Sequence, residues 1–225
     1  MPSVKQFFDA AYRSEPRYWW REPSRYSTDP DDHPSSLLTQ LMLRHVRGKP
    51  PGRALDLGCG EGADAIRLAR LGWEVDAVEI SEVGAAKTES FAREEGVGLT
   101  VWCMDAAAFT AGTPYDLVVC NGVLHYVEDK RALIERIQRM TASGGSNLVS
   151  LWSDYSPVPP CHRIVATHPD QEEGVTTSSY ASWRKELLYF ERNRSESSHC
   201  DMEPHVHSFI KLLAVQVDAA PQIGT

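Results

Sequence analysis

The stretch Ala54-Leu55-Asp56-Leu57-Gly58-Cys59-Gly60-Glu61-Gly62 decides how this chain folds. An apolar strand pattern runs into three glycines at alternate positions, and an amphipathic helix pattern begins at Ala63. Glycines at this spacing let the backbone turn sharply and let a ligand approach it closely, because no Cβ stands in the way. The first amides of the following helix would face the same ligand. The stretch therefore predicts a strand, turn and helix that bind a nucleotide-like ligand.

Other nucleotide-binding sites share this pattern. Gly58-x-Gly60-x-x-Ala63 also fits the glycine spacing of dinucleotide-binding folds. The carboxylate of Asp56 would then meet a pyrophosphate, a contact between like charges, whereas it suits a ligand with an ammonium, a sulfonium and no phosphate. The absence of a following Gly-Lys-Ser/Thr excludes a P-loop. A dinucleotide site and a purely structural glycine turn are the alternatives.

Strand and helix patterns alternate along the chain. Apolar runs predict strands at 53–57, 74–80, 99–104, 115–120, 147–152, 186–193 and 208–217. Helices are expected at 4–12, 37–46, 63–71, 81–95 and 129–140. This alternation indicates an α/β fold with a parallel sheet and right-handed crossovers, in which ligands bind beyond the carboxyl ends of the strands.

Residues 56–62, which read Asp-Leu-Gly-Cys-Gly-Glu-Gly, resemble the first motif of the class I S-adenosylmethionine-dependent methyltransferases. Glu79 follows Gly62 by 17 residues, and Met104-Asp105-Ala106 comes after the next predicted strand, as in that family. The likeness continues through residues 115–127. It implies a Rossmann-like, doubly wound, seven-stranded and mostly parallel sheet that a C-terminal antiparallel hairpin completes.

The resemblance covers roughly residues 50–152 and implies roles for individual positions. Glu79 would accept hydrogen bonds from the two ribose hydroxyls of S-adenosyl-L-methionine, and Asp105 would bind the adenine amino group. Asn121 and Gly122 would line the methionine end. The expected cofactor-binding residues are Asp56, Gly58, Cys59, Gly60, Gly62, Glu79, Ile80, Met104, Asp105, Ala106, Asn121 and Gly122.

Length and composition indicate a single domain. The resemblance implies that it is a methyltransferase domain at 35–225, with its cofactor-binding core at about 50–152 and substrate-side elements at 153–225. The net charge of −8 disfavours a nucleic-acid partner, and no apolar run is long enough to span a membrane. Five scattered cysteines and the absence of a secretion signal predict a cytoplasmic protein with reduced, buried thiols. We expect a monomer or homodimer.

The N-terminal residues 1–34 are rich in aromatic side chains and proline. We expect a lid over the cavity or a strap packed on the core, with Trp19, Trp20 and Tyr26 as apolar walls of the substrate site. A long proline-rich loop follows Trp152. A looser likeness to the tellurite-resistance and thiol methyltransferase group involves this aromatic N-terminus and the histidines at the last strand.

Methyl transfer to a neutral acceptor requires removal of a proton, so three histidines are candidate bases. His125 follows the fourth strand, where it either borders the methyl group or packs beneath the cofactor. His162 and His207 are further proton acceptors or anion contacts. His205 and His207 would share one face of a strand. No metal site is expected, because no acidic cluster or Cys-x-x-Cys accompanies these histidines.

These observations predict an S-adenosylmethionine-dependent methyltransferase that acts on a small-molecule nucleophile and yields S-adenosyl-L-homocysteine. One alternative is a detoxifying methyltransferase for thiols or chalcogens. Another is a catalytically silent subunit that binds the cofactor and regulates a partner.

Overall fold

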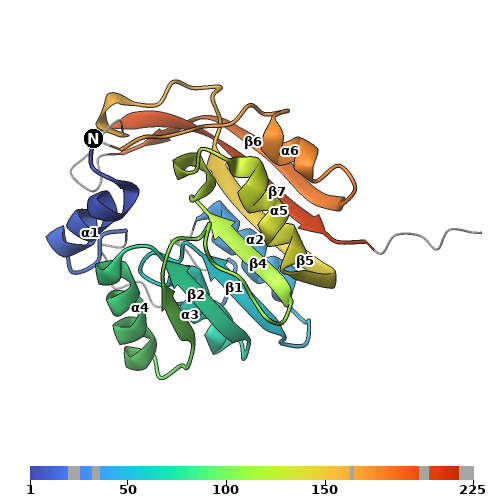
Figure 1. Ribbon diagram of the computed structural model, residues 1–225. Coiled ribbons are helices and arrows are strands. Elements are labelled where there is room, and N and C mark those ends of the chain that lie inside the picture. Colours follow the sequence, from blue (N-terminus) through green and yellow to red (C-terminus); the bar gives the residue numbers. More distant parts are fainter. Residues whose placement is uncertain (20–25, 32–35, 163–164, 198–202, 218–225) are drawn as a thin grey trace, which may run out of the picture.

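A seven-stranded sheet forms the centre of the computed structural model, which describes residues 1–19, 26–31, 36–162, 165–197 and 203–217 (Figure 1). The strands are β1 (Arg53–Leu57), β2 (Glu74–Glu79), β3 (Thr100–Cys103), β4 (Tyr115–Asn121), β5 (Thr141–Trp152), β6 (Arg184–Glu196) and β7 (His205–Val215). Their order is β3-β2-β1-β4-β5-β7-β6, and only the pairs that include β7 are antiparallel. The predicted fold class is confirmed.

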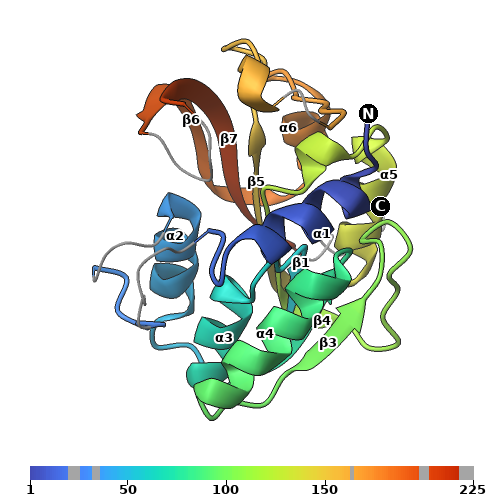
Figure 2. The same ribbon diagram turned by 90° about the vertical axis from the view of Figure 1, so that its left-hand side faces the viewer.

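Helices cover both faces of this sheet (Figure 2). They are α1 (Val4–Ser14), α2 (Leu37–Val46), α3 (Ala63–Arg70), α4 (Glu82–Glu94), α5 (Lys130–Arg139) and α6 (Val175–Ser179), with short 3-10 turns η1 (Leu124–Tyr126) and η2 (Pro160–His162). The α2, α3 and α4 helices lie on one face, and α5 and α6 lie on the other. Within the described residues, no helix is both long and apolar enough to cross a membrane.

The central strands form because their apolar runs are buried from both sides. Leu55 and Leu57 of β1 and Val118 and Val119 of β4 have no exposed surface. Strand β1 pairs with β2 on one side and β4 on the other. Strands β2 and β3 are added on one side of β1, and the chain then returns to add β4 on the other side. At such a change in strand order the carboxyl ends of β1 and β4 leave a crevice in which ligands bind.

The turn after β1 needs glycine at two positions. Gly58 has a φ of +81°, and a Cβ there would lie 2.2 Å from the Val123 side chain. Gly62 precedes α3 with a φ of +81°, and a Cβ would lie 2.7 Å from Thr88. The amides of Gly58 and Cys59 both donate to the carbonyl of Val78 on β2. The turn is thereby fixed against the neighbouring strand.

The N-terminal helix α1 is fastened to the start of α4. Ser81 is fully buried, and its hydroxyl donates to Asp9 Oδ1 at 2.7 Å while accepting from the Gly84 amide at 3.1 Å. Burial by itself raises the pKa of Asp9, but hydrogen bonds from Lys5 and Ser81 outweigh it and hold the pKa at about 2. One hydroxyl therefore caps α4 and holds α1 on it.

Two local expectations are corrected. Strand β5 begins at Thr141 and not at residue 147, because Thr141 pairs with Tyr115 before a bulge that precedes the pairing of Ser146 with Leu117. Cys103 is exposed, whereas we expected buried thiols, because it lies near the end of the short edge strand β3. Cys59 and Cys120 are buried as expected.

We predict that Ser81→Ala lowers the free energy of unfolding by about 1–2 kcal/mol, since it removes a helix cap and a buried partner of Asp9. Urea unfolding monitored by circular dichroism measures this loss. Ser90→Ala is the control, because the Ser90 hydroxyl donates to Glu94 Oε1 on the exposed side of the same helix. Equal stability of the two variants would contradict the assigned role of Ser81.

Candidate functional site

A cavity of about 560 Å³ opens at the carboxyl ends of β1, β2 and β4. It is lined by eleven of the twelve residues expected to bind a cofactor, the exception being Gly62, which is the N-cap residue of α3. The same cavity reaches the predicted catalytic histidines His125, His162 and His207. The fold therefore brings together, from segments across the whole chain, the residues that the sequence motifs singled out.

Glu79 is the central charged group of this cavity and is only 4% exposed. Its Oε2 accepts from the Gly60 amide at 2.9 Å, and its Oε1 accepts from the Ser81 amide at 2.8 Å. Burial raises the pKa of Glu79 to about 7, against the lowering effect of these backbone hydrogen bonds. The carboxylate thus joins the glycine turn to the start of α4 and changes its charge near neutral pH.

Asp56 has a structural contact in addition to its place in the cavity. Its Oδ2 accepts from the Ala65 amide at 3.0 Å, which caps α3, where Gly62 offers no side chain. Burial and the nearby carboxylate of Asp64 raise the pKa of Asp56 well above its usual range. A cation bound in the cavity would favour the ionised form of this carboxyl group.

The two remaining polar positions lie on opposite sides of these carboxylates. Asp105 is exposed after β3, and its Oδ1 accepts from the Ala107 amide at 2.8 Å in a tight turn. Asn121 ends β4, and its Nδ2 donates to Asp64 Oδ2 at 3.3 Å. Both side chains line the cavity. Their placement follows from the ends of neighbouring parallel strands.

The N-terminal segment is held over the glycine turn by Glu61. Its carboxylate accepts from the amides of Tyr18 at 3.0 Å and Trp19 at 3.1 Å. It also pairs with Lys87 Nζ at 2.8 Å, and Lys87 in turn donates to the carbonyl of Glu15. Sequence reasoning missed this role of Glu61, because nothing in the motif indicates which distant amides its side chain meets.

The predicted aromatic walls differ in where they lie. Trp19 lines the cavity while remaining 45% exposed, and its Nε1 donates to the hydroxyl of Tyr12, which itself lies against Gly60. Tyr26 also lines the cavity, but its ring belongs to a cluster with Ile66, Phe91 and Ala92 on α3 and α4. Trp20 falls outside the described residues. Tyr12 and Trp19 of the N-terminal segment therefore line the cavity beside the glycine turn.

His125 forms part of a stack of rings. It is buried, and its ring lies 4.0 Å from that of Trp152 with an interplanar angle of 9°. Burial lowers the pKa of His125 well below its usual range, so the ring is neutral. The Trp152 amide donates to its Nδ1 at 3.4 Å, which places the proton of the neutral ring on Nε2. This arrangement favours a packing or hydrogen-donating role over that of a general base.

Two residues of the cavity wall were not anticipated from the sequence. Trp152 stacks between His125 and His207, at ring distances of 4.0 Å and 4.7 Å. Arg194 on β6 also lines the cavity, and it is the register partner of His207 on β7. Neither residue belongs to a motif. Trp152 is placed by the end of β5, whereas Arg194 is placed by the antiparallel pairing of β6 with β7, which in turn pairs with β5.

Comparison with known proteins identifies the central part of the chain. Residues 54–145 match a family model described as "Methyltransferase domain". "Hemagglutinin 1" of Eikenella corrodens is 31% identical over 161 residues, which are 71% of this chain and 52% of that protein. The chain thus spans about half the length of this curated relative.

Two solved structures share the fold. TehB from Haemophilus influenzae has a TM-score of 0.67 at 21% identity, covering 77% of this chain and 60% of the other. The N-methyltransferase NodS from Bradyrhizobium japonicum WM9, in complex with S-adenosyl-L-homocysteine, also has a TM-score of 0.67, at 19% identity, covering 96% and 99%. The expected resemblance to class I methyltransferases is confirmed.

We predict that Glu61→Ala releases the N-terminal segment, because two amides and Lys87 lose their shared acceptor. Amide hydrogen exchange at Tyr18 and Trp19 should accelerate at least about 10-fold, in line with the loss of hydrogen bonds to a charged group. Hydrogen-exchange mass spectrometry of residues 1–19 measures this. The control is Glu89→Ala, an exposed residue of α4. Unchanged exchange in Glu61→Ala would show that the segment is held by its aromatic packing alone.

Proposed function

Because residues 54–145 form a methyltransferase domain of the class I S-adenosylmethionine-dependent type, we propose that this chain transfers a methyl group from S-adenosyl-L-methionine to a small-molecule nucleophile. One observation carries the proposal. The buried carboxylate of Glu79 lies at the end of β2 in hydrogen-bond contact with the glycine turn, inside the cavity beyond the carboxyl ends of the strands. That is where a ribose with two free hydroxyls is bound in folds of this type.

The residues present fit this cofactor. Glu79 has further lone pairs for the ribose hydroxyls beyond those used by Gly60 and Ser81. Asp56 supplies a buried carboxyl group whose ionised form a cationic ligand would stabilise. Asp105 is exposed to the cavity as an acceptor for the adenine amino group. The bound cofactor supplies an activated methyl group on a sulfonium, and the chain supplies its alignment and exclusion of water.

A small acceptor is favoured by the walls of the cavity. Its volume of about 560 Å³ lies within the range of roughly 300–1,000 Å³ that small-molecule sites occupy. Tyr12 and Trp19 cover one side, and Tyr126, Trp152 and Phe209 line another part. Aromatic and apolar walls of this kind are typical of sites for small molecules. The net charge of −8 also disfavours a nucleic-acid substrate.

A thiol or chalcogen acceptor is the second candidate, and the tautomer of His125 favours it. A thiolate needs no general base, and the proton on Nε2 of His125 makes that ring a poor one. The third hypothesis, a catalytically silent subunit that binds the cofactor and regulates a partner, differs from the other two in predicting no methyl transfer. Binding of S-adenosyl-L-methionine without methyl transfer to any member of a metabolite panel of hydroxyl, amine and thiol compounds would support it.

We predict micromolar affinity for S-adenosyl-L-methionine, about −8 kcal/mol, measured by calorimetry. Glu79→Ala should weaken binding by about 1.5–3 kcal/mol, since a charged group that accepts hydrogen bonds is lost. Glu89→Ala should bind as the wild type does. Tight binding of NADH together with no binding of S-adenosyl-L-methionine or S-adenosyl-L-homocysteine would overturn the proposed function.

The pKa of Glu79 predicts how this affinity depends on pH. With the cavity free of ligand its pKa is about 7, and the ribose hydroxyls donate best to the ionised carboxylate. Binding therefore favours loss of the proton, so affinity should rise as pH increases from about 6 to 8. In Glu79→Gln this dependence should disappear. An equal pH dependence in the variant would assign the effect to another group.

A further inference from the structure

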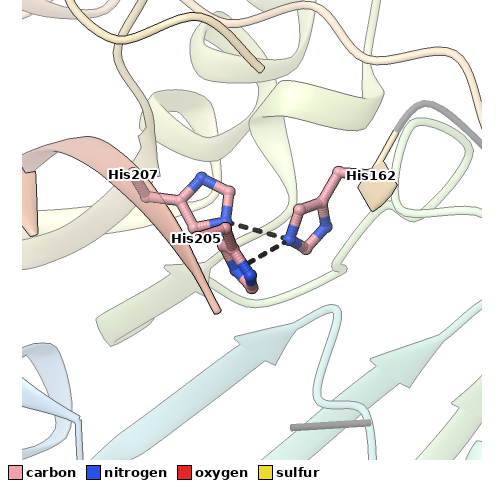
Figure 3. A group of neighbouring side chains, drawn as sticks. All are labelled: His162, His205 and His207. Atoms are coloured by element: carbon pink, nitrogen blue, oxygen red, sulfur yellow. Dashed lines mark hydrogen bonds between the residues drawn. The ribbon is translucent and has the colours of Figure 1, made fainter. Parts of the chain in front are cut away.

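We propose that His162, His205 and His207 bind one divalent transition-metal ion, for which Zn²⁺ is the best fit. Figure 3 shows the three imidazoles pointing toward one another, His162 from η2 and the other two from the start of β7. Nε2 of His162 lies 3.1 Å from Nε2 of His205 and 3.0 Å from Nε2 of His207. One ligand atom from each ring lies within 4.8 Å of the others.

These distances are close to those of a coordinated metal. With Zn–N distances of about 2.0–2.1 Å and tetrahedral angles, the ligand nitrogens of a zinc site are roughly 3.3–3.4 Å apart. The two distances from His162 lie just inside that spacing, and small rotations of the rings would bring all three nitrogens to it. Imidazole nitrogens suit Zn²⁺, and three histidines with a fourth position left for water or substrate are a recurrent catalytic arrangement.

A histidine that binds a metal through Nε2 must carry its proton on Nδ1, and the surroundings of His205 favour this tautomer. Its Nδ1 lies 2.6 Å from the backbone carbonyl of Glu203, so Nδ1 carries the proton and donates it. The lone pair of the neutral ring then resides on Nε2, which faces the other two rings. Such an outer hydrogen bond to a carbonyl orients most metal-binding histidines. The carboxylate of Glu196, 3.5 Å from the same Nε2, adds negative charge that favours a cation.

Two of the three rings also belong to the cavity already described, and the ring of His205 lies beside them. His162 and His207 line it, and the alternation of side chains along β7 puts His205 and His207 on one face. The ring of His207 stacks on Trp152 at 4.7 Å, and Trp152 stacks on His125 at 4.0 Å. His125 comes just after β4, which borders the cofactor side of the cavity. A metal here would face the acceptor end.

This position indicates a class of acceptor, an inference that rests on the proposed function. A hydroxyl or thiol group bound to a metal ion loses its proton at a lower pH, as metal-bound water does. The acceptor would release that proton to solvent. Its oxygen or sulfur would then form the new bond to the methyl carbon as the carbon–sulfonium bond breaks and its electron pair returns to sulfur. The site thus offers a substitute for a general base.

The proposal replaces the sequence-based expectation that no metal is bound. That expectation relied on ligand spacing along the chain, and His162 and His205 are separated by 43 residues. Only the return of β7 beside β5, together with the loop that follows Trp152, brings them into contact. Spacing patterns detect sites built from one local segment, and this site is built from two.

The test measures metal on protein without a histidine tag, stripped by chelator and dialysed. Zn²⁺ titrated by calorimetry, with stoichiometry from elemental analysis, should bind one per chain. His162→Ala, His205→Ala and His207→Ala should each weaken Zn²⁺ binding by more than about 10-fold. Loss of a residue that only hydrogen-bonds to a metal ligand already costs about 10-fold in affinity, and loss of a ligand should cost more. His168→Ala is the matched control, because the backbone amide of His168 makes its contact with His125 and its ring is outside the cluster.

Two outcomes would overturn the proposal. The first is that none of Zn²⁺, Cu²⁺, Ni²⁺, Co²⁺ and Fe²⁺ binds the stripped protein. The second is that Zn²⁺ binds a variant in which His162, His205 and His207 are all replaced by Ala as tightly as it binds the wild type. Binding of S-adenosyl-L-homocysteine, measured on the same samples, tests the proposed function separately and reports on folding. If the buried His207 variant does not fold, the half-buried His162→Ala decides the outcome.

Discussion

The site depends on the hydrogen bonds that the buried carboxylate of Glu79 accepts from two backbone amides. The carboxylate connects the glycine turn after β1 to the first turn of α4 through the amides of Gly60 and Ser81. Moving a carboxylate out of water is costly, and the raised pKa of this group expresses that cost. A fold that keeps such a group in place has an acidic acceptor at the centre of its cavity before any ligand arrives.

The N-terminal segment depends on the same region. Ser81 holds α1 through Asp9, and Glu61 holds the amides of Tyr18 and Trp19. Both anchors lie within or beside the glycine turn and the start of α4. A ligand that displaced Glu79 from Gly60 would therefore also affect the glycine turn and the start of α4, which anchor the N-terminal segment. The segment is coupled to the cavity by hydrogen bonds to charged groups and by packing of Phe8, Tyr12 and Tyr18.

The opposite wall of the cavity has a different chemistry. Carboxylates dominate the side near β1 and β2, whereas aromatic and imidazole rings dominate the side near β5 and β7. Trp152 at the end of β5 joins these rings into one stack. The division agrees with a cavity that binds a cationic cofactor on one side and positions an acceptor on the other. It also explains why the motifs that are common among methyltransferase domains leave the acceptor undetermined.

The sequence by itself determined which residues meet at the carboxylate side of the cavity, because each of them lies at or just after the end of a strand. Gly58 and Asp105 follow β1 and β3, and Glu79 and Asn121 end β2 and β4, so the order of these parallel strands predicts that the four residues meet at one edge. The contacts of the N-terminal segment and of the wall near β5 and β7 could not be predicted in this way. Glu61 meets Trp19, and His162 meets His205, through contacts between segments whose separation carries no periodic signal. Tertiary structure decided those contacts, because they depend on where a loop and an antiparallel hairpin pack and not on the local preferences of the chain.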